Sequence, residues 1–133
     1  MSITHTLEQR YNYVGGSENL INLVSDEQTA GSYLEISEAI PDNSTDLEVA
    51  MVMDVSEIAL VLITCDREIT FKTNSSSVPD ETITVDENTP IAWGSGLSGS
   101  NPLETDITAI FITNNVDELD ATLKVRVLYD PTP

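Results

Sequence analysis

The chain consists of short runs of β-branched, aromatic and aliphatic residues, separated at short intervals by Gly, Pro, Asn, Asp and Ser. Runs of this kind are typical of a β-sandwich or a β-barrel. No stretch has the apolar spacing of a long helix, and no βαβ unit or fixed repeat is visible. The pattern predicts an all-β, two-sheet sandwich of about nine or ten short strands, of jelly-roll type, with an immunoglobulin-like sandwich as the alternative.

The expected strands can be followed along the sequence. Residues 3–13 alternate, with the odd positions more apolar, and Gly15-Gly16 ends this run. Further strands are expected at 19–24, 32–37, 47–55, 58–65, 68–74, 82–85, 89–93, 106–114 and 121–129. The polar residues 25–31 predict a connection between the second and third strands.

Three connections carry specific expectations. The apolar run at 58–63 predicts a central strand covered on both faces, and Asp66-Arg67 predicts a tight turn that pairs it with 68–74 as a β-hairpin. Residues 94–102, GSGLSGSNP, hold three glycines and three serines, which predicts a mobile or binding loop. Residues 115–120, NVDELD, predict either another hairpin or a sheet crossover with an acidic tip.

The length of the chain bears on the number of domains, and its charge limits the class of partner. A chain of 133 residues is expected to form a single β-sandwich domain, residues 1–133. The 23 acidic residues and five basic residues give a formal net charge of −18. Because phosphate binding draws on clustered Lys and Arg, this composition argues against a nucleic-acid partner. The acidity favours solubility and suits either a salty medium or a basic protein partner.

The N-terminal residues lack a basic segment followed by an apolar run, so a cleaved secretory signal is not expected. The longest clean apolar run, 58–63, is too short to span a bilayer, which takes about twenty residues. We therefore expect a protein made in the cytoplasm, without a membrane partner. The single cysteine, Cys65, excludes an internal disulfide and is expected to be a small buried hydrophobe.

The residues that carry catalysis are sparse. The only histidine, His5, lies in the first expected strand, where a catalytic base would be isolated. The loop at 94–102 lacks the final glycine of a nucleophile elbow, and 64–68, TCDRE, has the composition of a hairpin tip. We therefore expect no catalytic residues, no cofactor and no enzymatic activity.

The stretch PDNSTDLE, residues 41–48, raises the question of a metal site. Asp42, Ser44 and Asp46 offer oxygen atoms at alternate positions, as a Ca²⁺ loop does. An EF-hand that begins at Asp42 needs Gly at its sixth position and Glu at its twelfth, where this chain has Leu47 and Met53. A Ca²⁺ loop of another geometry stays open as the less favoured alternative to a polar turn.

Sugar binding is a further alternative, because sandwiches of this type often present an exposed aromatic platform. Most of the aromatic residues fall within alternating strands, where the core needs them. Trp93, beside the loop at 94–102, is the candidate platform. A place in the core or at a subunit interface is the favoured interpretation of this residue.

The order of features from residue 41 onwards resembles small structural proteins of tailed bacteriophages, of the head-decoration or cement type. The segments concerned are IPDNSTDLEVAMVMDVSEIALVLITCDREITFKTNSSSVPDETITVDENTPIAWGSG, NPLETDITAIFITN and ATLKVRVLYD. They cover about two thirds of the chain. They consist of strand and loop patterns without a catalytic signature.

The resemblance implies a β-sandwich on the outside of a capsid, often trimeric, that ties neighbouring major capsid proteins together against internal DNA pressure. It implies location in the virion, the major capsid protein as partner, and a homotrimer. No docking residues follow from it. The alternatives are a carbohydrate-binding module and a minor tail or baseplate component of a phage.

Overall fold

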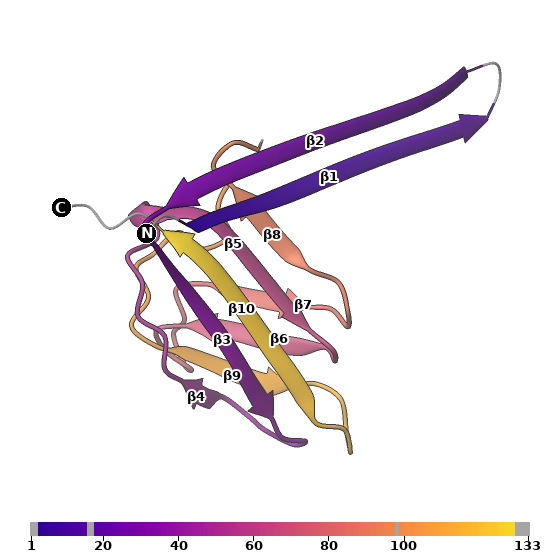
Figure 1. Ribbon diagram of the computed structural model, residues 1–133. Helices are drawn as coiled ribbons and strands as arrows, with labels where there is room; N and C mark the ends of the chain where they lie inside the picture. The colour runs from indigo at the N-terminus through magenta and orange to yellow at the C-terminus, as the bar shows by residue number, and fades with distance from the viewer. Residues whose placement is uncertain (1–2, 16–17, 98, 130–133) are drawn as a thin grey trace.

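The computed structural model describes residues 3–15, 18–97 and 99–129. This part of the chain forms ten strands and one short 3-10 helix (Figure 1). They are β1 (Ile3–Gly15), β2 (Glu18–Ala30), β3 (Ser32–Ile40), β4 (Leu47–Val49), η1 (Val55–Glu57), β5 (Ile58–Cys65), β6 (Ile69–Thr73), β7 (Thr82–Val85), β8 (Ile91–Gly94), β9 (Ile110–Asn114) and β10 (Ala121–Tyr129). The prediction of an all-β fold is confirmed.

Eight of these strands form two four-stranded antiparallel sheets. One sheet has the order β3-β10-β5-β8 and the other the order β4-β9-β6-β7. Figure 1 shows them lying one over the other. β1 and β2 form a third, two-stranded sheet that projects from this sandwich.

The pairing of strands within the sandwich is nested. β3 pairs with β10, β4 with β9, β5 with β8, and β6 with β7, so the first of the eight strands pairs with the last and each following strand with the next one inward. The chain from β3 to β10 therefore has the connectivity of one long antiparallel hairpin folded over into two layers. Most of the hydrogen-bonded neighbours are consequently distant in sequence.

The core lies between the two sheets and follows the period-two alternation of the strands. In β10 the side chains of Leu123, Val125 and Val127 are fully buried, and the residues between them are exposed. Phe71 and Ile112 lie at paired positions of the second sheet and are also fully buried. Burial of a large aliphatic or aromatic side chain contributes about 1.5–3 kcal/mol, so this interlayer cluster is the main source of stability.

The predicted hairpin at Asp66-Arg67 is wrong. β5 belongs to the first sheet and β6 to the second, so the chain crosses between layers at this point. β5 already has β10 and β8 on its two edges, which leaves no edge for β6. The carboxylate of Asp66 accepts a hydrogen bond of 2.7 Å from the amide of Thr122, so the crossover is tied to the start of β10.

The acidic segment 115–120 is a second crossover, because β9 and β10 lie in different sheets. The side-chain amide of Asn114 donates to the carbonyl of Leu119 at 2.7 Å and to that of Ile40 at 3.2 Å. Asn114 is buried, and these bonds satisfy its amide where the chain leaves β9. Of the two connections that the sequence left open, the structure therefore has the crossover.

The expected strand at 47–55 is shorter than predicted. β4 ends at Val49, and the chain then makes an isolated bridge between Met53 and Ile107 before η1. Met51 and Met53 are nevertheless buried, with exposed residues on either side, so period-two burial continues past the end of β4. The carboxylate of Asp54 accepts the amide of Ser56 at 3.0 Å and caps η1 in place of further strand pairing.

The expected connection at 25–31 is also wrong over most of its length, because β2 continues through Ala30. β1 and β2 pair without interruption from Ile3 opposite Ala30 to Gly15 opposite Glu18. Main-chain hydrogen bonds do not require apolar side chains, so a polar sequence continues the ribbon. β1 ends at Gly15 as predicted, and Gly16 lies outside the described residues.

Truncation of Phe71 tests the interlayer core. Phe71 is fully buried, and we expect Phe71→Ala to lower the free energy of unfolding by about 3–5 kcal/mol, because it removes apolar contact and leaves a cavity. The matched control is Val78→Ala at a side chain that is 78% exposed, which should change stability by less than about 0.5 kcal/mol. Denaturant unfolding measures both, and equal effects would contradict this description of the core.

Candidate functional site: the β1–β2 arm and its root

The β1–β2 ribbon, here called the arm, is the most distinctive feature of the molecule. Its 13-residue strands extend far beyond the sandwich (Figure 1). At about 3.3 Å per residue the arm is about 40 Å long. Among the side chains that the structure describes, those at the end near the sandwich, here called the root (residues 3–8 and 25–30), pack against the body: Ile3 and Leu7 contact a small apolar cluster that includes Leu60 and Leu128.

A local irregularity in β5 allows the root to dock. Leu128 pairs with Leu60 whereas Tyr129 pairs with Ile58, so Ala59 is an extra residue in β5. The bulge turns Ile58 toward the interlayer core and Leu60 toward the root. Both faces of β5 are therefore covered at this end, as the apolar run at 58–63 predicted.

The polar contact at the root is the carboxylate of Asp26, which is only 4% exposed. One of its oxygens accepts the amide of Gly96 at 3.0 Å, and the other accepts the side-chain amide of Gln28 at 2.5 Å. Burial of a carboxylate is costly unless its oxygens are hydrogen-bonded. These two bonds supply partners from β2 itself and from the loop after β8.

Two glycines form the cradle into which Asp26 fits. A Cβ atom added at Gly94 would lie 2.0 Å from Oδ2 of Asp26, and one added at Gly96 would lie 2.3 Å from Oδ1. Both distances are far below van der Waals contact. The Gly-Ser-Gly sequence at 94–96 is therefore needed for close approach of the carboxylate, and the loop predicted to bind something binds the arm of its own chain.

A shallow pocket of about 240 Å³ lies beside the root, lined by His5, Thr6, Leu7, Leu60, Leu62 and Arg126. The ring of His5 lies edge-on to Tyr33, with 6.3 Å between centroids. The guanidinium of Arg126 is 3.4 Å from the carboxylate of Glu35. The pocket thus combines an apolar floor with one paired cation, and His5 packs against an aromatic ring.

A second pocket, of about 420 Å³, lies at the opposite end of β5 and is lined by Thr64, Cys65, Asp66, Asn88, Thr122 and Lys124. Cys65 is a free cysteine and is buried, as predicted. Burial raises the pKa of its thiol, and the negative charge of Asp66 acts in the same direction. The thiol therefore stays protonated at neutral pH and is a poor nucleophile.

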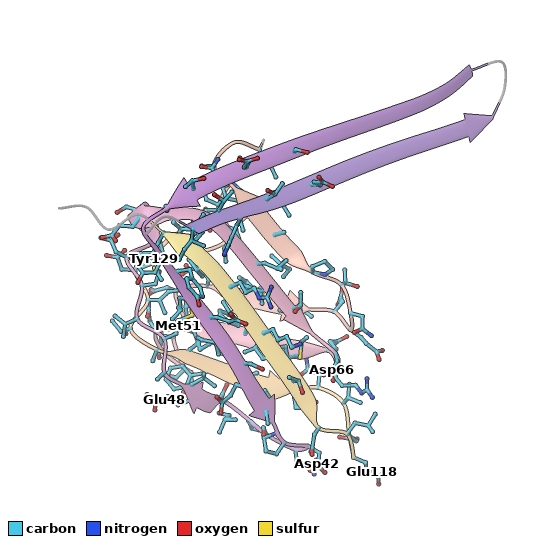
Figure 2. All side chains as sticks on the ribbon, viewed as in Figure 1. Asp42, Glu48, Met51, Asp66, Glu118 and Tyr129 are labelled. Atoms are coloured by element: carbon cyan, nitrogen blue, oxygen red, sulfur yellow. The ribbon has the colours of Figure 1, made fainter. Side chains whose placement is uncertain are left out.

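Residues 41–44 form a turn. The amide of Ser44 donates to the carbonyl of Pro41 at 3.2 Å, and Asn43 adopts a φ of 60°, which asparagine tolerates better than most residues. The amide of Asp42 donates to the carboxylate of Asp120 at 2.9 Å, so the turn is fastened to the acidic crossover before β10. These contacts agree with the polar-turn interpretation of this stretch. Figure 2 shows Asp42 at the same end of the molecule as Glu118, which lies in that crossover.

Asp46 lies apart from that turn. Its carboxylate is 3.0 Å from the ammonium of Lys72 on β6, and its amide donates to the hydroxyl of Thr113 at 3.0 Å. Among the residues the structure describes, no group of three or more His, Cys, Asp or Glu is placed to hold a metal ion. The Ca²⁺ hypothesis at Asp42, Ser44 and Asp46 stays a prediction from sequence.

Trp93 lies on β8, opposite Val61, and its ring packs against the interlayer core. The indole N–H donates to the carbonyl of Gly99 at 3.2 Å. The side chain is half-buried, so its position agrees with the core interpretation rather than with an open platform. Its hydrogen bond to Gly99 also holds the loop whose first part cradles Asp26.

Sequence reasoning missed Asp26 as a site residue. In sequence it stands in a polar stretch, SDEQTAG, and nothing there distinguishes it from neighbouring acids. The available signal was the spacing of Gly94 and Gly96, which indicated a close backbone approach without showing what approaches. The contact itself joins residues 70 positions apart.

Comparisons with known proteins give no relatives: no family model, no curated protein and no solved structure matches this chain. In the part that the structure describes, no helix is long and apolar enough to cross a membrane.

Alanine substitutions at Gly96 and at Gly31 should differ in their effect on stability and on hydrogen exchange at the root. Gly96→Ala places a methyl group against the Asp26 carboxylate, and we expect a loss of about 1–3 kcal/mol with faster amide hydrogen exchange at the root. Gly31→Ala is the matched control, since its Cβ atom meets nothing within 4 Å. Exchange mass spectrometry of both variants checks this, and equal root exchange in the two would contradict the cradle.

Proposed function

We propose that this chain is a non-enzymatic structural protein of a bacteriophage virion, a head decoration or cement protein that stabilises the capsid by bridging major capsid proteins. The observation that carries the proposal is the arm, which a docked root holds out from the sandwich. A bridging protein needs a surface that reaches beyond its own body. The segments that resemble phage decoration proteins include strands β4 to β10 of the sandwich on which the arm is mounted.

We also infer that the sandwich is of jelly-roll type. The nested pairing of β3 with β10, β4 with β9, β5 with β8 and β6 with β7 supports this assignment, because a jelly roll places eight strands in two sheets through two Greek keys. Both ends of such a sandwich carry crossover loops. The glycine loop after β8 is one of these, and it holds the root.

The charge distribution suits a particle exterior. The net charge of −18 disfavours contact with DNA and with other acidic particles. The cations on described side chains are also partly neutralised, since Arg67, Lys72 and Arg126 each lie within 3.4 Å of a carboxylate. The proposed partner is the major capsid protein, and the proposed location is the outside of the capsid.

The alternatives differ in what they require of the structure. A carbohydrate-binding module needs an exposed aromatic platform, and the packing and hydrogen bond of Trp93 do not favour it. A minor tail or baseplate component would use the same sandwich and arm. Its copy number would be far lower than that of the capsid protein, which separates the two experimentally.

The test is the composition of particles. In phage particles purified on a density gradient from a culture that expresses this chain, we expect mass spectrometry to detect it at a copy number comparable to that of the major capsid protein. Heads that lack it should release DNA at a lower temperature. Absence of the chain from the particles would refute the proposal, and a few copies per particle would favour the tail alternative.

A further inference from the structure

We propose that the outward side of the sheet β3-β10-β5-β8, next to the root, binds a neutral oligosaccharide. The pairing of β3, β10 and β5 sets their outward side chains in rows across the sheet. From the root outwards the rows are Tyr33, Leu128 and Leu60; Glu35, Arg126 and Leu62; Ser37, Lys124 and Thr64; and then Ala39 and Thr122, with Asp66 bonded to the amide of Thr122. These rows, here called the outer face, extend about 20 Å from Tyr33 to Ala39.

The two pockets described above both lie on the outer face. The smaller one occupies the corner between the root and the sheet, where Thr6 and Leu7 stand over Leu62 and Arg126. The larger one includes Lys124, which is two positions from Arg126 on β10. The pockets are therefore neighbours along β10, and an extended ligand can contact both.

Tyr33 supplies an exposed aromatic ring at the root end of the outer face. It is 50% exposed, whereas Trp93 packs against the interlayer core on the inward side of the same sheet. The ring of His5 lies edge-on to that of Tyr33, and His5 lines the smaller pocket, so Tyr33 lies beside this pocket. The face of an aromatic ring is electron-rich and attracts the weakly positive C–H groups of a pyranose ring. Tyr33 thus provides the aromatic contact that the sequence assigned to Trp93.

The polar side chains of the outer face match hydroxyl groups better than an ion of one sign. A sugar hydroxyl both donates and accepts hydrogen bonds. The carboxylate of Glu35 only accepts, Arg126 and Lys124 only donate, and the hydroxyls of Ser37 and Thr64 do both. A phosphate group would require donors alone, and an ammonium group would require acceptors alone. The mixture therefore favours a ligand that carries many hydroxyl groups.

The charges of the outer face favour a neutral ligand. Arg126 and Lys124 balance Glu35 and Asp66, so the four rows carry no net charge in a chain of net charge −18. The Arg126 and Glu35 side chains are 55% and 49% exposed, so both can still bond to a ligand. Lys124 forms no ion pair with any side chain that the structure describes. The negative field of the whole chain repels acidic glycans, and the two cations of the outer face disfavour basic ligands.

This inference goes beyond the proposed structural role and does not depend on it. The outer face is formed by the sandwich and the root of a single chain. The particle experiment above measures incorporation into the capsid, whereas the experiment below measures binding by the purified chain. Either result can therefore fail without the other.

An array of neutral oligosaccharides of glucose, galactose, mannose and N-acetylglucosamine, probed with the full-length chain, tests the inference. We expect binding to at least one of them. Titration of that oligosaccharide should shift NMR amide signals of β3, β10 and β5. Tyr33→Ala should weaken binding about tenfold through loss of the aromatic contact, whereas Tyr33→Phe keeps the ring and should bind within about threefold of the wild-type affinity.

Lys124→Ala removes a hydrogen-bond donor and should weaken binding about fivefold. Thr82→Ala is the control, since Thr82 is an exposed residue of β7 in the other sheet, and it should leave the affinity unchanged. A thermal melt in the wild-type range shows that each variant is folded. A wild-type chain that binds none of these oligosaccharides would overturn the inference. So would wild-type affinity in both Tyr33→Ala and Lys124→Ala, or amide shifts confined to the sheet β4-β9-β6-β7.

Discussion

The position of the arm depends on one buried carboxylate. Asp26 lies where β2 meets the loop after β8, and it is accommodated because Gly94 and Gly96 have no side chains. A buried carboxylate without hydrogen-bond partners would cost several kcal/mol, and the amide of Gly96 and the side chain of Gln28 supply those partners at the root. The apolar cluster around Leu60 stabilises the contact between root and body, but apolar contact is not directional. The hydrogen bond between Asp26 and the amide of Gly96 fixes the position of the root on the body.

The sandwich explains why the arm is free to project. Nested pairing from β3 to β10 completes both sheets with eight strands, and β1 and β2 are left to pair with each other. The bulge at Ala59 gives the outer face of β5 an apolar residue on which they rest. The same fold therefore provides a body and a mount for an extended element, as the proposed bridging role requires.

Strands that show period-two alternation could be predicted from the sequence. Strand pairing and the burial of Asp26 could not, because they depend on residues far apart in the chain. The strand at 121–129 was predicted correctly because a buried strand shows period-two burial. The Asp66-Arg67 hairpin was wrong because turn composition does not show that both edges of β5 are already occupied. Asp26 was missed because its burial depends on glycines 68 and 70 positions later. The long ribbon was missed because backbone pairing leaves little trace in a polar sequence.

The NMR behaviour of the Gly96 amide tests most directly whether its hydrogen bond to Asp26 holds the root on the sandwich. If its hydrogen bond to Asp26 holds the root, this amide is shifted downfield and is protected from exchange, although it lies in an otherwise exposed glycine loop. The downfield shift and the protection should both disappear in Asp26→Ala while the core amides of β10 stay protected. A Gly96 amide that exchanges as fast as that of Gly99 in the wild-type chain would contradict the account.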